Sequence, residues 1–235
     1  MMDERFQRTR LLVGEENFLK LNAATVAIFG IGGVGSFTVE ALARSGIGHL
    51  VLIDKDNVDV TNINRQIHAL TSTVGKSKVE ILRERILEIN PAAKVDTIQK
   101  FYLPDEPVEN FFICNYDYVV DAIDTITAKI SLVSECQRRG IKIISSMGAG
   151  NKLDPTRFKV ADIFQTTVDP VAKVMRKKLK ENGVTNLKVV YSEEIPKKID
   201  AGNLTGKVIG SVAFVPSIAG LILAAEVVKD IGGLN

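Results

Sequence analysis

The 235-residue chain has no tryptophan and only two cysteines, Cys114 and Cys136, which lie far apart in the sequence. Such cysteines provide neither a CxxC metal motif nor a disulfide framework, which indicates a reducing compartment. A chain of this length buries enough apolar surface to fold without metal or disulfide. We therefore predict a cytoplasmic protein that is held together by its hydrophobic core.

An excess of charge of one sign is also missing. The chain has 30 lysines and arginines against 28 acidic residues, a formal net charge of +2. This balance excludes binding of nucleic acid through an overall basic field. Any contact with nucleic acid must come from a local basic patch.

Long hydrophobic runs are scarce. The N-terminal sequence MMDERFQRTR lacks the apolar segment of a signal peptide. Segment 208–225 is uncharged, mostly apolar and close to the minimum length of a membrane span, but Pro216 divides it. We interpret it as a short strand followed by a helix that is buried in the core or at a subunit interface, and expect no stable membrane insertion.

What the chain does contain is a regular alternation of strand-like and helix-like segments. Short apolar runs without alternating polar residues indicate strands buried on both faces of a parallel sheet, and parallel strands require crossover helices. The predicted strands are 25–30, 49–54, 94–100, 118–123 and 141–147, and the predicted helices are 36–45, 78–89 and 127–139. We predict an α/β protein with a Rossmann-like, doubly wound, mainly parallel sheet.

The glycine motif GIGGVG occupies positions 30–35, between the first predicted strand and the first predicted helix. Its glycines permit a tight turn and let backbone amides approach phosphates at the helix N-terminus. Asp54 closes the next predicted strand, where a carboxylate meets a ribose hydroxyl in nucleotide-binding folds. This order predicts a nucleotide site formed by Gly30, Gly32, Gly33, Gly35 and Asp54, but it does not choose among NAD, FAD and ATP.

The residues after Asp54 favour ATP. Segment 54–66, DKDNVDVTNINRQ, is rich in side chains that bind phosphate and ribose. Cleavage between the α- and β-phosphates of ATP develops negative charge, which Arg65 and Lys78 can neutralise. The predicted ATP contacts are Asp54, Asp56, Asn64, Arg65, Gln66 and Lys78, whereas Lys55, Asp59 and Lys76 are interpreted as solvated loop residues.

Asp124 is the predicted metal ligand. It follows the predicted strand 118–123, and ligands of such sheets bind beyond the carboxyl ends of the strands. A carboxylate at this position can hold Mg²⁺. Asp121 is the competing candidate, although its position places it within the strand.

Four features together resemble the ThiF/MoeB and ubiquitin-activating adenylyltransferase superfamily. They are GIGGVGS at 30–36, D-x-D-x-V-x-x-T-N-x-N-R-Q at 54–66, Lys78, and DAIDT at 121–125. The resemblance implies attack of a carboxylate on the α-phosphate of ATP, which gives an acyl-adenylate and pyrophosphate, with Arg65, Lys78 and Asp124 in the catalytic site. It also implies a homodimer in which an N-terminal arginine, here Arg8, reaches the partner's triphosphate.

The remaining sequence narrows the resemblance. Superfamily members that activate sulfur-carrier proteins usually carry CxxC motifs, which are missing here, and both cysteines lie in segments that predict packing roles. Segments 145–155, 190–196 and 210–216 resemble tRNA threonylcarbamoyladenosine dehydratases, so the similarity covers nearly the whole chain. In that group the threonyl carboxylate of a modified adenosine beside the anticodon would be adenylated. An internal nucleophile would then close a ring with net loss of water.

A basic amphipathic helix is predicted after the cap formed by Asp169 and Pro170. Lys173, Arg176, Lys177 and Lys180 fall on one face, opposite Val171, Val174, Met175 and Leu179. Such a stripe can follow the phosphate backbone of tRNA, and the alternative is a plain solvated face. We predict tRNA contacts at the four basic residues.

The strand–helix rhythm becomes irregular after position 150. We predict an adenylation core over 1–150, with an N-terminal helical arm over 1–24, and a smaller C-terminal α+β region of the same domain over 151–235. The second region is expected to face tRNA and to support dimerisation. Residues 195–206 hold few apolar side chains, so we expect a mobile loop there.

Three functions remain open at this point. The first is a tRNA-specific adenylating dehydratase, with room for a sulfur-relay partner from a cysteine desulfurase system. The second keeps the adenylation but takes the C-terminal carboxylate of a small sulfur-carrier or ubiquitin-like protein. The third is an NAD-dependent oxidoreductase, which rests on the glycine motif and Asp54 alone.

Overall fold

The computed structural model describes residues 4–199 and 209–234. These residues form one seven-stranded sheet with the order β3-β2-β1-β4-β5-β7-β6, in which only β6 is antiparallel to its neighbour. The strands are β1 (Thr25–Phe29), β2 (His49–Ile53), β3 (Lys94–Ile98), β4 (Tyr118–Asp121), β5 (Lys142–Ser146), β6 (Phe158–Asp162) and β7 (Lys188–Ser192). The predicted doubly wound, mainly parallel α/β fold is confirmed.

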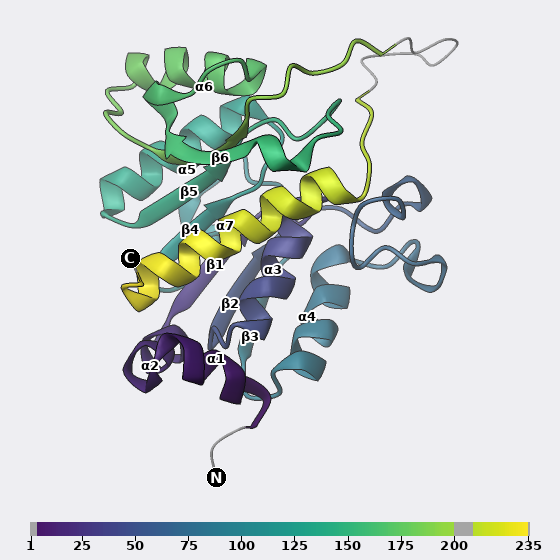
Figure 1. Ribbon diagram of the computed structural model, residues 1–235, viewed down its shortest axis with the longest axis vertical. Coiled ribbons are helices and arrows are strands. Elements are labelled where there is room, and N and C mark those ends of the chain that lie inside the picture. The colour runs from purple at the N-terminus through teal and green to yellow at the C-terminus, as the bar shows by residue number, and fades with distance from the viewer. Residues whose placement is uncertain (1–3, 200–208, 235) are drawn as a thin grey trace.

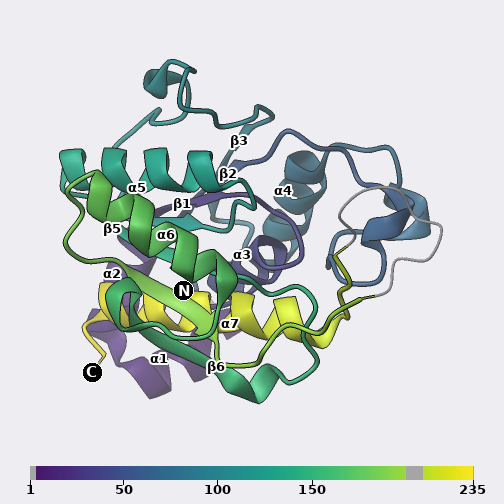
Figure 2. The ribbon, with the colours of Figure 1, turned by 90° about the horizontal axis from the view of Figure 1, so that it is seen from above.

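Helices cover both faces of the sheet (Figure 1, Figure 2). They are α1 (Gln7–Val13), α2 (Glu15–Ala23), α3 (Gly35–Arg44), α4 (Lys78–Ile89), α5 (Ile126–Arg139), α6 (Pro170–Glu181) and α7 (Phe214–Gly232). The core between α3, α4, α7 and the sheet is separate from the cores beneath α5 and α6. Helices α1 and α2 lie at the end of the sheet where β1 begins.

The strands are apolar on both sides because each contributes to two cores. In β1, Val26 and Ile28 pack into the core with α3 and α7, whereas Ala27 and Phe29 pack into the core with α5. Successive side chains of a strand point to opposite faces, so a strand covered on both faces shows no polar alternation. This is the pattern from which the strands were predicted.

Segment 208–225 differs from its prediction. Residues 209–213 form no strand, and α7 begins at Phe214 and continues to Gly232. Pro216 lies in the first turn of this helix, where a backbone N–H has no intrahelical acceptor and proline is therefore tolerated. Among residues 4–199 and 209–234, no helix combines the length and apolarity required to cross a membrane.

The segment predicted as a mobile loop is only partly described. Residues 195–199 are irregular, and the amide of Lys197 donates to the carbonyl of Asn151 at 2.7 Å. Residues 200–206 of the predicted loop lie outside the described part of the chain. The base of this segment is therefore fixed to the chain that follows β5.

Candidate functional site

The glycine motif lies at the carboxyl end of β1, between β2 and β4, where the strand order reverses and such sheets bind ligands. Gly30 has a φ of 85°, and a Cβ there would lie 2.7 Å from the carbonyl oxygen of Ala122. A Cβ at Gly35 would collide with the carbonyl oxygen of Gly30. At Gly32 the nearest atom to an added Cβ would be Gln66 Nε2 at 3.9 Å, so this position borders open space.

Asp54 joins the glycine motif to the chain that follows β2. Its Oδ2 accepts from the amide of Ile31 at 2.7 Å, and its Oδ1 accepts from the amide of Asp56 at 2.9 Å. β2 ends at Ile53, so Asp54 lies just outside the strand rather than closing it. The carboxylate therefore shapes the turn at which it was predicted to meet a ribose.

Lys78 is the most deeply buried cation near this turn, with 4% of its surface exposed. It is the first residue of α4, and its Nζ lies 3.0 Å from Asp56 Oδ2. Burial raises the pKa of Asp56, but hydrogen bonds from Lys55 and Lys78 outweigh this and hold that pKa below its ordinary value. A buried ammonium with three donors and one carboxylate beside it can bind a second anionic group.

The motif residues 64–66 surround the same space. Arg65 Nη1 donates to the carbonyl of Thr61 at 2.9 Å and to Asn64 Oδ1 at 2.8 Å, while the Asn64 amide donates to the carbonyl of Ser211 at 3.0 Å. Gln66 is buried, and its Oε1 has no hydrogen-bond partner among the described residues. The Gln66 amide nitrogen lies toward Gly32, and the orphaned oxygen of the same side chain is an acceptor that a ligand or water can complete.

Asp124 and Asp121 have different environments. Asp121 is the last residue of β4 and is fully buried, where it accepts from Ser145 and lies 2.9 Å from Lys129 Nζ. Asp124 is exposed beyond the strand, and its Oδ1 accepts from Thr125 Oγ1 at 3.2 Å. Of the two, only Asp124 has a carboxylate that a metal ion can reach.

Three of the predicted site carboxylates, Asp54, Asp56 and Asp124, lie near enough to Lys55 to affect its pKa. A hydrogen bond from Lys55 to Asp56 raises the pKa of this lysine, and the charges of Asp54 and Asp124 act in the same direction. No group of three or more metal-binding side chains occurs among the described residues. Mg²⁺ commonly takes one or two protein carboxylates together with substrate phosphates, so an exposed Asp124 fits that mode of binding.

His68 is a buried polar residue that no sequence pattern singled out. Its side chain is 2% exposed, and neither ring nitrogen has a hydrogen-bond partner among residues 4–199 and 209–234. Burial and the nearby charge of Lys78 lower the pKa of His68 to about 4. A neutral imidazole therefore lies beneath the motif that carries Arg65 and Gln66.

Arg8 lies apart from these residues. It is exposed on α1, which precedes α2 and the amino end of β1, whereas the glycine motif follows the carboxyl end of β1 (Figure 1). A five-residue strand spans about 17 Å. Arg8 and Lys78 of one chain are thus on opposite ends of the sheet.

The basic stripe of α6 differs in two respects from the predicted one. Lys173, Lys177 and Lys180 are exposed, but Arg176 is half-buried and its Nη1 donates to the carbonyl of Thr166 at 2.8 Å. Val174, predicted on the apolar face, is 46% exposed. The helix turns Ala172, Met175 and Leu179 toward its core, so the buried stripe is narrower than expected.

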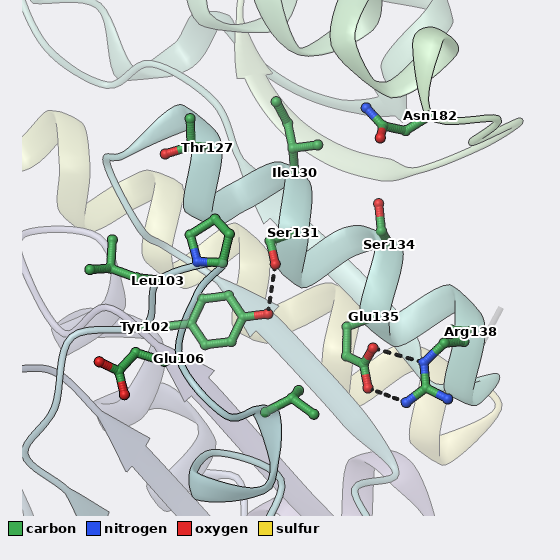
Figure 3. A pocket seen from close by; sticks show the side chains of 12 residues that line it. Tyr102, Leu103, Glu106, Thr127, Ile130, Ser131, Ser134, Glu135, Arg138 and Asn182 are labelled. Carbon is green, nitrogen blue, oxygen red and sulfur yellow. Dashed lines mark hydrogen bonds and ion pairs between the residues drawn. The ribbon is translucent and has the colours of Figure 1, made fainter.

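A separate pocket of about 490 Å³ lies between segment 102–108 and the outer side of α5 (Figure 3). Tyr102 Oη and Ser131 Oγ share a hydrogen bond of 3.2 Å, and Glu135 pairs with Arg138. None of the predicted site residues lines this pocket. It is a surface feature of α5 and not part of the site at the carboxyl edge.

The two cysteines are packing residues, as predicted. Cys136 is buried in α5, and burial raises the pKa of its thiol. Cys114 is half-buried, and burial raises its pKa as well. Neither thiol is activated for sulfur chemistry, because the thiolate is the nucleophilic form.

The arrangement matches a known family over almost its whole length. Residues 6–235 match the model of the ThiF family. The chain belongs to the ThiF family. Its adenylyltransferase-like glycine motif, acidic turn and Lys78 are therefore features of a ThiF-family fold rather than of an oxidoreductase, and the predicted family is confirmed.

Two relatives of this ThiF-family chain are especially informative. The tRNA threonylcarbamoyladenosine dehydratase of Bacillus subtilis is 49% identical, and the match covers 98% of this chain and 95% of that protein. The E. coli tRNA N6-threonylcarbamoyladenosine dehydratase TcdA has been solved in complex with ATP and in complex with AMP. Each of these structures has a TM-score of 0.90 and 37% identity, covering 98% of this chain and 94% of that one.

Proposed function

We propose that this chain is an ATP-dependent tRNA threonylcarbamoyladenosine dehydratase. The observation that carries the proposal is the buried Lys78, which pairs with Asp56 in the acidic turn that Asp54 joins to the glycine motif. The chain is also 49% identical to a dehydratase over nearly its full length. The ATP and AMP complexes of TcdA support a nucleotide in this position. The proposed contacts are Gly30, Gly32, Gly33, Gly35, Asp54, Asp56, Asn64, Arg65, Gln66 and Lys78.

The chemistry has two steps. An oxygen of the threonyl carboxylate attacks the α-phosphorus of ATP, and pyrophosphate leaves with the electrons of the broken P–O bond. A nucleophile within the threonylcarbamoyl group then attacks the activated acyl carbon, AMP leaves with the former carboxylate oxygen, and a proton is released. The modified nucleoside has lost one water, and no nucleophile from the protein is needed.

The protein acts by positioning and by charge. Lys78 and Arg65 neutralise the negative charge that develops as pyrophosphate leaves, since prepositioned cations stabilise such charge without reorganisation. Asp124 would hold Mg²⁺ together with the phosphates, and the ion would supply further positive charge there. Gln66 Oε1, which is buried without a partner among the described residues, accepts a hydrogen bond from the nucleotide.

We propose a homodimer in which Arg8 serves the partner's site. Leu11 and Leu12, which follow Arg8 on α1, are 81% and 87% exposed. Phe214 and Leu221 on α7 are also exposed apolar side chains. Adjacent apolar side chains of this size are unfavourable in water and are typical of an interface. Arg8 is too far from the site of its own chain to act there. A dimer contact through α1 would place it near a second chain.

The proposal assigns tRNA to the C-terminal region of the chain, residues 151–235. Residues 151–235 carry the lysines of α6, and the stripe is expected to contact the phosphate backbone. A sulfur-relay partner from a cysteine desulfurase system stays a prediction from the family resemblance. It rests on no residue of the site.

The test is a nucleoside analysis. The chain is incubated with ATP, Mg²⁺ and tRNA that carries threonylcarbamoyladenosine. The tRNA is then digested to nucleosides, and their masses are measured by mass spectrometry. We expect loss of one water from that nucleoside and one AMP per product. Lys78→Met should abolish both, and Lys76→Met is the matched control because Lys76 is an exposed lysine two positions away.

Two results would contradict the proposal. AMP release that needs a small carrier protein and ignores tRNA would assign the chain to the carrier-protein adenylyltransferases. Equal activity of the Lys78→Met and Lys76→Met variants would remove Lys78 from the catalytic site, whatever the substrate.

A further inference from the structure

A buried ion pair contacts both peptide groups of one residue, Gly148, in the chain that follows β5. Lys152 and Asp169 are 2% and 1% exposed, and Lys152 Nζ lies 2.7 Å from Asp169 Oδ2. The same Nζ donates to the carbonyl of Gly148 at 2.6 Å, while the amide of Gly148 donates to Asp169 Oδ1 at 3.4 Å. The pair therefore fixes the Gly148 residue through both its donor and its acceptor. We call these three residues the Gly148 clamp.

Both charged members of the clamp follow a residue with an unusual backbone. Asn151 and Val168 each have a φ of 59°, and no other non-glycine residue in the described ranges 4–199 and 209–234 has a positive φ. For a β-branched residue this conformation is a genuine outlier, and Val168 forms a γ-turn in which Asp169 N donates to Thr167 O at 2.5 Å. Such strain persists where the surrounding structure over-determines it, and it concentrates at functional sites.

The clamp lies beside the proposed catalytic site. In the register of the parallel pair β4–β5, Asp121 is directly opposite Ser145. Asp124 and Gly148 each lie three residues after this pair, so both belong to the segments that leave the carboxyl ends of β4 and β5, two neighbouring strands that lie about 5 Å apart. Gly148 is half-buried, so it stays partly accessible in the chain that follows the carboxyl end of β5, the end of such strands where ligands bind.

Asn151, the neighbour of Lys152, connects this part of the chain to the nucleotide motif through hydrogen bonds that the clamp residues do not make. The amide of Asn151 donates to the carbonyl of Gly210 at 2.8 Å, and the amide of Gly210 donates back to Asn151 Oδ1 at 2.6 Å. The next residue, Ser211, accepts from Asn64. Segment 209–211 is thus held between the chain after β5 and the motif that is proposed to bind ATP.

We propose that Lys152 and Asp169 are positioning residues that shape the wall for the acceptor carboxylate, on the side of Asp124 away from the ATP motif. The inference rests on the proposed function, since it assumes that a carboxylate substrate is adenylated at this edge. ATP is bound by the chain after β1 and β2, whereas the clamp organises the chain after β5. Loss of the clamp should therefore affect the acceptor and leave ATP binding unchanged.

A purely structural role is the alternative, and general energetics do not favour it. A buried ion pair contributes little net stability relative to neutral residues of similar volume, because desolvation offsets the attraction. Removing only one partner strands a buried charge and is strongly destabilising. The informative variant therefore replaces both residues, Lys152→Met with Asp169→Asn, because the amide introduced at position 169 retains an oxygen that can cap α6 at Ala172.

A control lysine–aspartate pair, half-buried rather than fully buried, is available at the other end of the sheet. Lys188 begins β7, and its Nζ lies 2.8 Å from Asp230 Oδ2. The variant Lys188→Met with Asp230→Asn removes the same types of residue at the amino edge, distant from Asp124. The measurements are the Kd for ATP, the kcat/KM for tRNA carrying threonylcarbamoyladenosine, and amide hydrogen exchange along the chain.

We expect the clamp variant to lose about 10- to 100-fold in kcat/KM for tRNA, the range that a small misplacement of reacting groups can cause. Its Kd for ATP should stay at the parent value. Hydrogen exchange should rise over residues 147–151 and not over residues 30–35. The control variant should keep the parent kcat/KM.

The proposal is overturned if ATP affinity and tRNA turnover fall together, if the control loses as much turnover, or if exchange rises throughout the chain. It is also overturned if the clamp variant turns tRNA over at the parent rate. A parent chain that gives no AMP with modified tRNA would refute the proposed function instead. The two failures can be told apart, because the proposed function is tested on the parent chain before any residue is substituted.

Discussion

At the residue scale, the chemistry of the site depends on polar groups that have few partners. The buried ammonium of Lys78 forms an ion pair with Asp56. Gln66 Oε1 and both ring nitrogens of His68 have no hydrogen-bond partner among the described residues. Burying polar atoms without hydrogen bonds costs about 1–3 kcal/mol for each group. Such atoms are retained near a site where a ligand or ordered water completes them.

His68 gives a prediction about acid stability. Below its ordinary pKa of about 6.5 the imidazole of the unfolded chain gains a proton, whereas in the folded chain it stays neutral until about pH 4. The unfolded state therefore binds more protons in this window, and the free energy of unfolding falls as pH decreases from about 6.5 to about 4. The full difference is on the order of 3 kcal/mol.

The substitution His68→Leu should remove this contribution. We expect the free energy of unfolding of the variant to exceed that of the parent by an amount that grows as the pH is lowered from 6.5 to 4, measured by urea unfolding at several pH values. The control is His49→Gln, which leaves His68 in place and should retain the His68 contribution. A constant difference between parent and His68→Leu across the window would contradict the prediction.

At the scale of the element, α6 shows how a helix divides its charges between two tasks. Arg176 donates to the carbonyl of Thr166, the residue that follows the short 3₁₀ turn before the helix, whereas Lys173, Lys177 and Lys180 are exposed to solvent. Of the four residues in the predicted stripe, the three lysines are therefore the ones suited to contact RNA. Charge reversal at Arg176 would test folding instead, because it would remove the hydrogen bond to Thr166.

The triple variant Lys173→Glu, Lys177→Glu and Lys180→Glu should weaken tRNA binding. The logarithm of the association constant for tRNA falls linearly with the logarithm of the salt concentration, and each lost phosphate contact makes that slope shallower by about one. We therefore expect the magnitude of the slope to be about three less than that of the parent. Filter binding at several salt concentrations measures it. The control reverses Lys94, Lys142 and Lys229, which carry the same total charge and lie toward the amino edge. Equal slopes in the triple variant and the parent would refute the role of the stripe.

At the scale of the whole molecule, the separation of Arg8 from Lys78 makes the dimer testable. If Arg8 acts across the interface, Arg8→Ala and Lys78→Met are each inactive alone. A mixed dimer of the two variants has one site with Lys78 from one chain and Arg8 from the other. With random exchange of subunits, about one quarter of the parent activity should return.

The control mixes Lys78→Met with Asp124→Asn. These residues belong to the site of one chain, so every site in the mixed dimer lacks one of them and no activity should return. The readout is AMP formation after subunit exchange. Absence of recovery with the Arg8→Ala mixture would assign Arg8 to a role within its own chain or to none.

The elements and the family could be predicted because their signals are local. The glycine motif, the 54–66 motif and the helix Lys78–Ile89 depend on spacing within one segment, and the structure gives that helix the predicted bounds. The strands are recognisable because double-sided burial removes polar alternation. The predicted strand before α7 was wrong, since an apolar run does not distinguish a strand from the first turn of a buried helix.

The sequence by itself determined the fold class, the family and the set of residues that can carry the chemistry, because each depends on local pattern. Only the tertiary structure decided which of them share a site. It separated Arg8 from Lys78, turned Arg176 inward, and left His68 without a partner among the described residues. It also joined Lys152 to Asp169 across 17 positions. Burial and pairing between distant positions leave no local signal, because they arise only when the chain brings those positions together in one core.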